Sequence, residues 1–298
     1  MGAAAGRQRR FDFPRLTMLF QIRHGLRYCY DRPVFLEPMT VRLTPRQNGH
    51  QRLLHHHVRV KAEPAGMSRI LEPDGTDALV CWFDQERAEL EIEMESVVET
   101  LLENPFGWIE THEAAQRLPV TYPIDEAASL APSCGGAVPG SVRIWAEALA
   151  EEVDRSATAF LMRLADEIHS SFDHVGRLDG DPMTAEQTLQ TRSGACRDTA
   201  TLFVASCRSQ GLAARFVSGY SMHHPPEVSE HELHAWAEVY LPGGGWRGYD
   251  PSLGLAVADG HVVLAAAPDH RLAAPVSGTY RGTGVGSQMT YTVHVKAT

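Results

Sequence analysis

The first third of the chain contains short stretches in which apolar and polar residues alternate. Phe20 and Ile22 are separated by a polar residue, and the clearest run, Glu89–Glu95, places leucine, isoleucine and methionine between glutamates. A period of two sends the apolar side chains to one face of a strand and the charged ones to the other. Asp74-Gly75 supplies a turn between two such strands. We therefore predict a small antiparallel β domain in which one strand has an acidic, solvated face.

Helical spacing begins after a segment that proline and glycine interrupt repeatedly. Residues 105–140 hold these breakers, and we interpret them as a connector. Apolar residues then recur every three or four positions in residues 142–153 and 157–172, which predicts two helices. A short helix is predicted to follow Thr184, because Gln187 stands at the spacing of a capping box.

Cys196 is predicted to stand at the start of a further helix. Apolar positions such as Phe203 and Cys207 recur at helical spacing after the loop at Gly194, and Gly211 suits the helix end. The helix dipole and the unpaired N–H groups of the first turn favour a thiolate, and they can also hold an oxyanion. A lone cysteine is more often an ordinary core residue, so a catalytic interpretation depends on partners elsewhere in the chain.

A predicted hairpin supplies those partners. The segment from His234 to Tyr240 alternates, a run of glycines signals a turn, and the segment from Trp246 to Asp250 returns. In an antiparallel hairpin, the numbers of two directly opposed residues always add up to the same value. If Tyr240 is opposite Trp246, His234 and Asp250 lie on one face as diagonal neighbours. In a register whose sum is smaller by two, they lie directly opposite each other on that face. A carboxylate beside an imidazole fixes its tautomer and orients it. The alternative is two unrelated residues at a hairpin.

Three motifs in this order resemble the catalytic core of bacterial transglutaminase-like cysteine enzymes. They are Gly194-Ala-Cys-Arg-Asp198, His234-Ala-Trp-Ala-Glu-Val-Tyr240 and Trp246-Arg-Gly-Tyr-Asp-Pro-Ser252, and the match covers roughly residues 142–272. The resemblance implies a papain-like core whose catalytic residues are Cys196, His234 and Asp250. Arg27-Tyr-Cys-Tyr-Asp-Arg-Pro33 also resembles the β domain that precedes many such cores.

The predicted fold class is α+β, with an N-terminal antiparallel β domain followed by a papain-like transglutaminase core of helices packed on an antiparallel sheet. A C-terminal strand is expected to return to one of the two domains. The predicted segments are a disordered extension over 1–17, the β domain over 18–104, the connector over 105–140, the catalytic core over 141–275 and the C-terminal strand over 276–298.

Composition limits the class of partner. The chain of 298 residues is 43% hydrophobic and 21% charged, with a net charge of −10, as expected for a soluble globular protein. The negative charge argues against nucleic acid or an anionic membrane as partner. Five scattered cysteines do not form a disulfide framework, which predicts a reducing, cytoplasmic location. His55-His56-His57 point alternately to opposite faces of a strand, so we predict no metal and no cofactor.

The predicted reaction is acyl transfer from a peptide or protein amide through a thioester on Cys196. Gln190 stands at the position where papain-like proteases place an oxyanion-hole glutamine and could donate a second hydrogen bond, although a surface position on its helix is the favoured interpretation. The loop at 222–232 is expected to form a rim of the cleft. This loop is polar and lacks aromatic residues that would keep water from the thioester, so hydrolysis is favoured over amine transfer. Two rival hypotheses are a catalytically silent binding module with the same fold and a metal site using Cys196 and His234.

Overall fold

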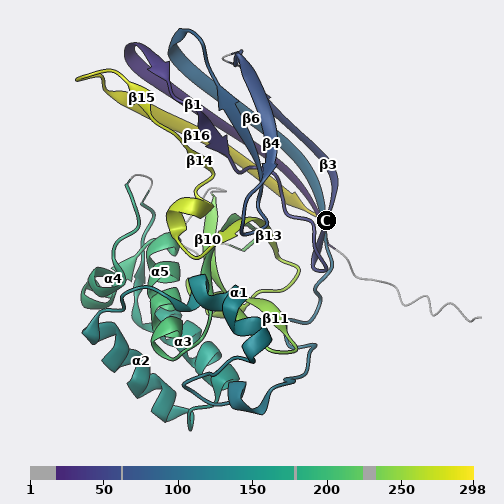
Figure 1. Ribbon diagram of the computed structural model, residues 1–298, viewed down its shortest axis with the longest axis vertical. Coiled ribbons are helices and arrows are strands. Elements are labelled where there is room, and N and C mark those ends of the chain that lie inside the picture. The colour runs from purple at the N-terminus through teal and green to yellow at the C-terminus, as the bar shows by residue number, and fades with distance from the viewer. Residues whose placement is uncertain (1–17, 62, 178–179, 224–232) are drawn as a thin grey trace, which may run out of the picture.

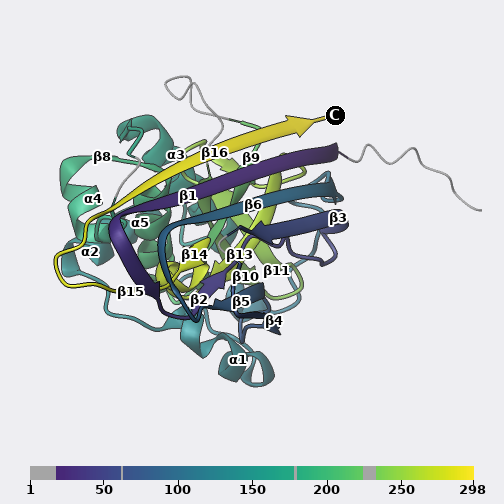
Figure 2. The same ribbon diagram turned by 90° about the horizontal axis from the view of Figure 1, so that it is seen from above.

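The computed structural model of the protein describes residues 18–61, 63–177, 180–223 and 233–298. Long strands from the N-terminal part lie against one side of a mixed core of helices and strands (Figure 1). Figure 2 shows these long strands running side by side across that core. The predicted α+β class is confirmed. No helix in the described ranges is long and apolar enough to cross a bilayer.

The larger N-terminal sheet has the order β15-β1-β6-β3, and β16 also pairs with β1. Its strands are β1 (Met18–Leu36), β3 (Gln51–Val60), β6 (Glu86–Thr100), β15 (Tyr280–Arg281) and β16 (Ser287–Ala297). The alternation predicted for β6 is confirmed, because Leu90 and Ile92 are buried on one face. On the other face Lys61 Nζ donates to Glu91 at 2.8 Å and to Glu93 at 2.6 Å.

A smaller sheet has the order β14-β2-β5-β4. Its strands are β2 (Met39–Val41), β4 (Gly66–Leu71), β5 (Asp77–Trp82) and β14 (Val276–Ser277). The predicted turn at Asp74-Gly75 is confirmed between β4 and β5, and Gly75 has a φ of +83°, which favours glycine. The late strands β14, β15 and β16 therefore complete sheets that begin near the start of the chain.

The helical layer of the core is formed by segments in the middle of the chain. They are η1 (Glu113–Ala115), α1 (Ile124–Cys134), α2 (Gly140–Glu152), α3 (Ala157–Ser171), α4 (Ala185–Thr191) and α5 (Cys196–Ser209). The two helices predicted from spacing are α2 and α3, and the predicted capping box of Thr184 and Gln187 is present at α4. The segment interpreted as a connector contains α1, which its prolines did not predict. Pro132 lies in the last turn of α1, so the backbone hydrogen bond that it removes is close to the end of the helix.

The central sheet has the order β12-β11-β10-β9-β13. Its strands are β9 (Ala214–Ser221), β10 (His234–Leu241), β11 (Gly245–Asp250), β12 (Leu255–Ala256) and β13 (His261–Ala267), and η2 (His270–Ala273) follows. The predicted hairpin is confirmed, with Tyr240 opposite Trp246. Gly243 has a φ of +85°, and a Cβ there would lie 2.2 Å from the carbonyl oxygen of Ile109. In this register Asp250 is a diagonal neighbour of His234.

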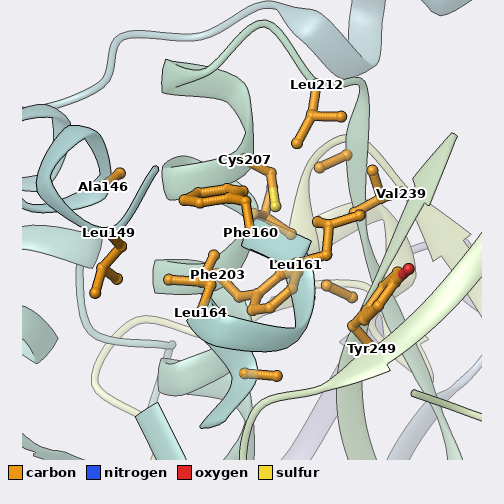
Figure 3. Close-up of a cluster of buried hydrophobic side chains, with 14 of the residues drawn as sticks. Ala146, Leu149, Phe160, Leu161, Leu164, Phe203, Cys207, Leu212, Val239 and Tyr249 are labelled. Atoms are coloured by element: carbon orange, nitrogen blue, oxygen red, sulfur yellow. The ribbon is translucent and has the colours of Figure 1, made fainter. Parts of the chain in front are cut away.

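A buried cluster fixes α5 against this sheet (Figure 3). Phe160 and Leu161 of α3 pack beside Phe203 and Cys207 of α5. Phe203 also stacks on Tyr249 of β11, with ring centroids 5.9 Å apart. Because the cluster joins α5 to the hairpin, it sets the position of the start of α5 relative to the residues of β10 and β11.

A second buried cluster joins the N-terminal sheet to the central sheet. Phe20 and Ile22 of β1 share this cluster with Tyr220 of β9 and Val262 of β13. His24 Nδ1 lies 2.8 Å from the hydroxyl oxygen of Tyr220. The N-terminal sheet is therefore packed directly on the core, rather than being tethered by a linker alone.

His24 at this contact is expected to make the fold sensitive to acid. Burial lowers the pKa of His24 from 6.5 to about 4. Below pH 6.5 the unfolded chain binds a proton at this position that the folded chain does not bind, so stability falls as the pH decreases towards 4. Between pH 7.5 and pH 5 this contribution to the free energy of unfolding should fall by about 2 kcal/mol, measured by denaturant unfolding.

The His24→Asn variant tests this source of pH dependence, since the amide does not titrate and can still bond to Tyr220. Its free energy of unfolding should change with pH by about 2 kcal/mol less than that of the wild type. His57→Asn is the matched control, because His57 is exposed on β3. An identical pH dependence in wild type and His24→Asn would contradict the prediction.

Candidate active site

Cys196 is the first residue of α5, and a buried carboxylate fixes the turn that precedes it. Asp198 is completely buried. A Cβ added to Gly194 would lie only 2.8 Å from the Cβ of Asp198, so the close approach requires glycine. The carboxylate accepts hydrogen bonds from the N–H of Ala195 at 2.8 Å, the N–H of Met183 at 2.7 Å and Nη2 of Arg177 at 2.6 Å. These bonds hold the sulfur at the helix N-terminus, where backbone N–H groups favour negative charge.

The hairpin of β10 and β11 brings a histidine and a carboxylate together. Nε2 of His234 donates to Oδ2 of Asp250 at 2.6 Å, and both side chains are buried. The other oxygen, Oδ1, accepts from the N–H of Ser252 at 3.0 Å and from its hydroxyl at 2.7 Å. The two carboxylate oxygens therefore have separate tasks, one binding the imidazole and one anchoring to the backbone.

A second histidine, which sequence reasoning missed, shares the same carboxylate. His261 begins β13, and its Nε2 lies 3.0 Å from Oδ2 of Asp250. The indole of Trp236 contacts both imidazoles, with centroids 5.1 Å from His261 and 6.0 Å from His234. In the sequence His261 is a single histidine at a strand start, with no local signal that links it to Asp250. Only the pairing of β13 with β9 places it there.

Burial and charge act in opposite directions on these groups. Burial alone would lower the pKa of His234, but the charge and hydrogen bond of Asp250, with the hydrogen bond to Cys196, hold that pKa well above its usual value. Burial would raise the pKa of Asp250, yet His234 and His261 hold it far below its usual range. Burial lowers the pKa of His261 more than Asp250 raises it. The favoured state is an ionised Asp250 between a protonated His234 and a neutral His261.

The cysteine lies in the same cavity lining as the histidine of this pair. The Cys196 side chain is half-buried, and its interaction with His234 helps to raise the pKa of that imidazole. Because Nε2 of that imidazole faces Asp250, Nδ1 is the nitrogen left for the sulfur. Cys207 differs, since it is buried in the core and its pKa is raised by burial (Figure 3). The arrangement of sulfur, imidazole and carboxylate suits proton transfer between Cys196 and His234.

The same geometry bears on metal binding. His234, Asp250 and His261 are the group of described residues whose side chains lie close enough to share an ion. Their N–O distances of 2.6 Å and 3.0 Å are hydrogen-bond distances. Two ligands of a tetrahedral zinc ion would lie roughly 3.4 Å apart. The trio therefore fits proton sharing better than metal coordination.

Cys196 and His234 lie on the wall of a cavity of about 640 Å³. The opposite side of the cavity is formed by the N-terminal sheet, with Tyr28 of β1 and Tyr291 of β16 among its lining residues. The sequence-based preference for hydrolysis depends on the lack of aromatic residues in one segment, the loop at 222–232. The aromatic residues that the other domain brings to the cavity were therefore missed.

Gln190 is not brought to this group. It is exposed on α4 and does not belong to the described lining of the cavity. Ala185 and Thr188 form the buried face of α4, and Gln190 lies on the other face. An oxyanion role for Gln190 gains no support from this position. Most of the rim predicted at 222–232, namely residues 224–232 with His224 and His231, lies outside the described residues.

Comparisons with known proteins agree with this architecture. Residues 20–99 match the bacterial transglutaminase-like N-terminal region, and residues 146–251 match the transglutaminase-like superfamily. An uncharacterised protein of Mycobacterium leprae is 29% identical over 269 residues, which cover 88% of this chain and 92% of that protein. A similar uncharacterised protein of Mycobacterium tuberculosis is 27% identical over 278 residues, covering 88% and 87%.

A solved structure shares the fold over most of the chain. It is the crystal structure of a candidate cysteine protease from Cytophaga hutchinsonii, with a TM-score of 0.71 and 21% identity, covering 95% of this chain and 90% of that one. The two matched family regions together span more than half of the sequence, in the order that the motifs predicted. The chain therefore belongs to the transglutaminase-like superfamily, whose members are typically cysteine-dependent enzymes, and carries the bacterial N-terminal region of that superfamily ahead of the core.

Proposed function

We propose that the protein is a thiol enzyme that cleaves amide or peptide bonds through a thioester on Cys196. One observation carries this proposal: the buried His234–Asp250 pair, joined at 2.6 Å, shares a cavity lining through His234 with Cys196, which starts a helix. Burial removes these groups from water, so the charge of Asp250 acts strongly on the imidazole. If His234 served only to stabilise the fold, it would not need a half-buried thiol on the same wall of the cavity.

The first half of the reaction forms the thioester. The thiolate of Cys196 attacks the amide carbonyl, and the carbon–sulfur bond forms as the carbonyl oxygen becomes negative. Backbone N–H groups at the start of α5 stabilise that oxygen. The protonated His234 then donates its proton to the departing amine as the carbon–nitrogen bond breaks.

The second half returns the enzyme to its starting state. Water loses a proton to the neutral His234 and attacks the thioester, and the carbon–sulfur bond breaks. Asp250 stabilises the imidazolium in both halves, while the neutral His261 donates to the same carboxylate oxygen. His261 is thus a positioning residue, which acts on the reaction through Asp250.

The charges of the cavity favour water over a lysine-type amine as the acceptor. The described lining of the cavity contains three arginines, Arg177, Arg197 and Arg271. Asp181 is the residue of this lining that carries a carboxylate. In the described part of the lining, arginines outnumber carboxylates, so this part carries no excess negative charge that would attract an ammonium group. An amine would also have to lose its proton before it attacked. Hydrolysis is therefore the proposed default, and amine transfer is the alternative.

The partition of the thioester is testable with a labelled primary amine. A peptide amide substrate is supplied with the amine in mild excess, and the acid and amide products are separated by mass spectrometry. We expect the acid product to predominate, because water is present at tens of molar and the described lining of the cavity has no excess of negative charge to concentrate cations. Predominant incorporation of the amine would instead establish a transferase.

A further inference from the structure

The side of the cavity that faces Cys196 is formed by alternate residues on neighbouring strands of the N-terminal sheet. Leu26, Tyr28 and Tyr30 are alternate residues of β1, so they project from one face of that strand. Their partners on β16 are Tyr291, Met289 and Ser287, in direct register. All six residues line the cavity, and we call them the sheet wall.

The sheet wall continues a face that is otherwise buried. Further along the same face of β1, Phe20 and Ile22 are packed against the central sheet. The core covers that part and does not reach the part near Tyr28, where the cavity lies instead. Met289 in the sheet wall is 38% exposed. The sheet wall is therefore an apolar surface, similar to the buried part of the same face, and it is accessible to a molecule bound in the cavity.

The sheet wall carries no formal charge near neutral pH. Tyr30 and Tyr280 meet edge to face, with centroids 5.0 Å apart. Burial, together with the neighbouring Tyr28 and Tyr280, raises the pKa of Tyr30 to about 12. Tyrosine rings bind aromatic and aliphatic groups by stacking and apolar contact. The arginines of the cavity lie elsewhere, on segments that flank Cys196 and on η2.

We infer that the sheet wall binds a bulky apolar side chain, preferably aromatic, on the acyl part of the amide substrate. This inference rests on the proposed thioester chemistry of Cys196. The acyl part is the part that must stay bound, because it remains attached to the sulfur while the amine leaves and water enters. A cavity of about 640 Å³ is large enough for one large side chain and its neighbouring backbone.

The test uses the purified full chain and reagents that alkylate a reactive thiol. Acetyl-phenylalanyl and acetyl-glycyl chloromethyl ketones carry the same reactive group and differ only in the side chain. The alkylation rate of Cys196 is measured by peptide mass mapping and divided by its rate with iodoacetamide, which needs no side-chain site. In the wild type we expect the phenylalanyl reagent to exceed the glycyl reagent by about 10- to 100-fold.

Two neighbouring residues of β16 provide a matched pair of variants. Met289→Asp places a carboxylate in the sheet wall, whereas Gln288→Asp places it on the opposite, exposed face of the same strand. Both positions are exposed enough to accept the change without loss of the fold. We expect Met289→Asp to lower the phenylalanyl-to-glycyl ratio at least about tenfold, and Gln288→Asp to leave it at the wild-type value.

The outcomes distinguish failure of the inference from failure of the proposed function. Rapid alkylation by iodoacetamide with equal phenylalanyl and glycyl rates would overturn the inference while leaving the thiol chemistry in place. Equal effects of Met289→Asp and Gln288→Asp on the ratio would do the same. A Cys196 that reacts with iodoacetamide no faster than the exposed Cys29 would overturn the proposed function, and with it the inference.

Discussion

Replacing Cys196 with alanine is expected to abolish amide cleavage, with a loss on the order of 10⁶-fold. In the proposed mechanism the sulfur forms the acyl-enzyme, and the remaining His234–Asp250 pair has no group to activate in its absence. Alanine is small and suits a helix, so the fold should be retained. The measurements are the rate of product release and the mass of a trapped acyl-enzyme, with thermal unfolding as the check on folding.

The matched control is Cys207→Ala on the same helix. Cys207 is completely buried in the cluster of Figure 3, so this change should lower the free energy of unfolding by about 1 kcal/mol. Turnover per folded molecule should stay near that of the wild type. If Cys196→Ala cleaved the substrate as fast as the wild type, the nucleophile would have to be another group.

Replacing Asp250 with asparagine is expected to reduce turnover on the order of 10⁴-fold. Both oxygens of Asp250 accept hydrogen bonds, Oδ2 from the two histidines and Oδ1 from Ser252. An asparagine has only one oxygen. When that oxygen serves Ser252, the amide NH₂ faces His234 and makes its Nε2 an acceptor. The ring proton then lies on Nδ1, which can no longer take a proton from Cys196.

His261→Gln provides the comparison for this effect. Glutamine removes the second imidazole but leaves the bond between His234 and Asp250, so the loss should be about tenfold, the value of one hydrogen bond to a charge. Steady-state kinetics of the two variants give the contrast, with unfolding curves to correct for folded protein. Equal losses in Asp250→Asn and His261→Gln would show that the carboxylate has no special task towards His234.

Features that depend on local spacing were predicted from the sequence. The alternation at β6, the capping box at Thr184 and the hairpin register at Tyr240 and Trp246 all follow from periods of a few residues. Placing Asp250 beside His234 required only the parity of that hairpin. These predictions succeeded because side-chain direction in a strand or helix is fixed by the backbone itself.

Several features that depend on distant segments were not predicted. His261 reaches Asp250 because β13 pairs with β9, and that pairing contains a register shift between Val263 and Ala265. No parity argument crosses such a shift. The sheet wall is formed by packing of one domain on the other, which leaves no periodic signal in either. Gln190 had the separation of an oxyanion donor, but the burial of Ala185 and Thr188 turns it to solvent.

The pairing of β16 with β1 has a consequence for the order in which the chain becomes functional. Leu26 is opposite Tyr291, so one side of the cavity is assembled from segments synthesised at the two extremes of the described sequence. Contacts of such high sequence separation form late in folding. During synthesis α5 and the hairpin can pack while β1 has β6 beside it but still lacks β16. Under the proposed mechanism, Cys196 would be in place before the inferred binding surface is complete, so selective cleavage would begin only after β16 had been synthesised and had paired with β1.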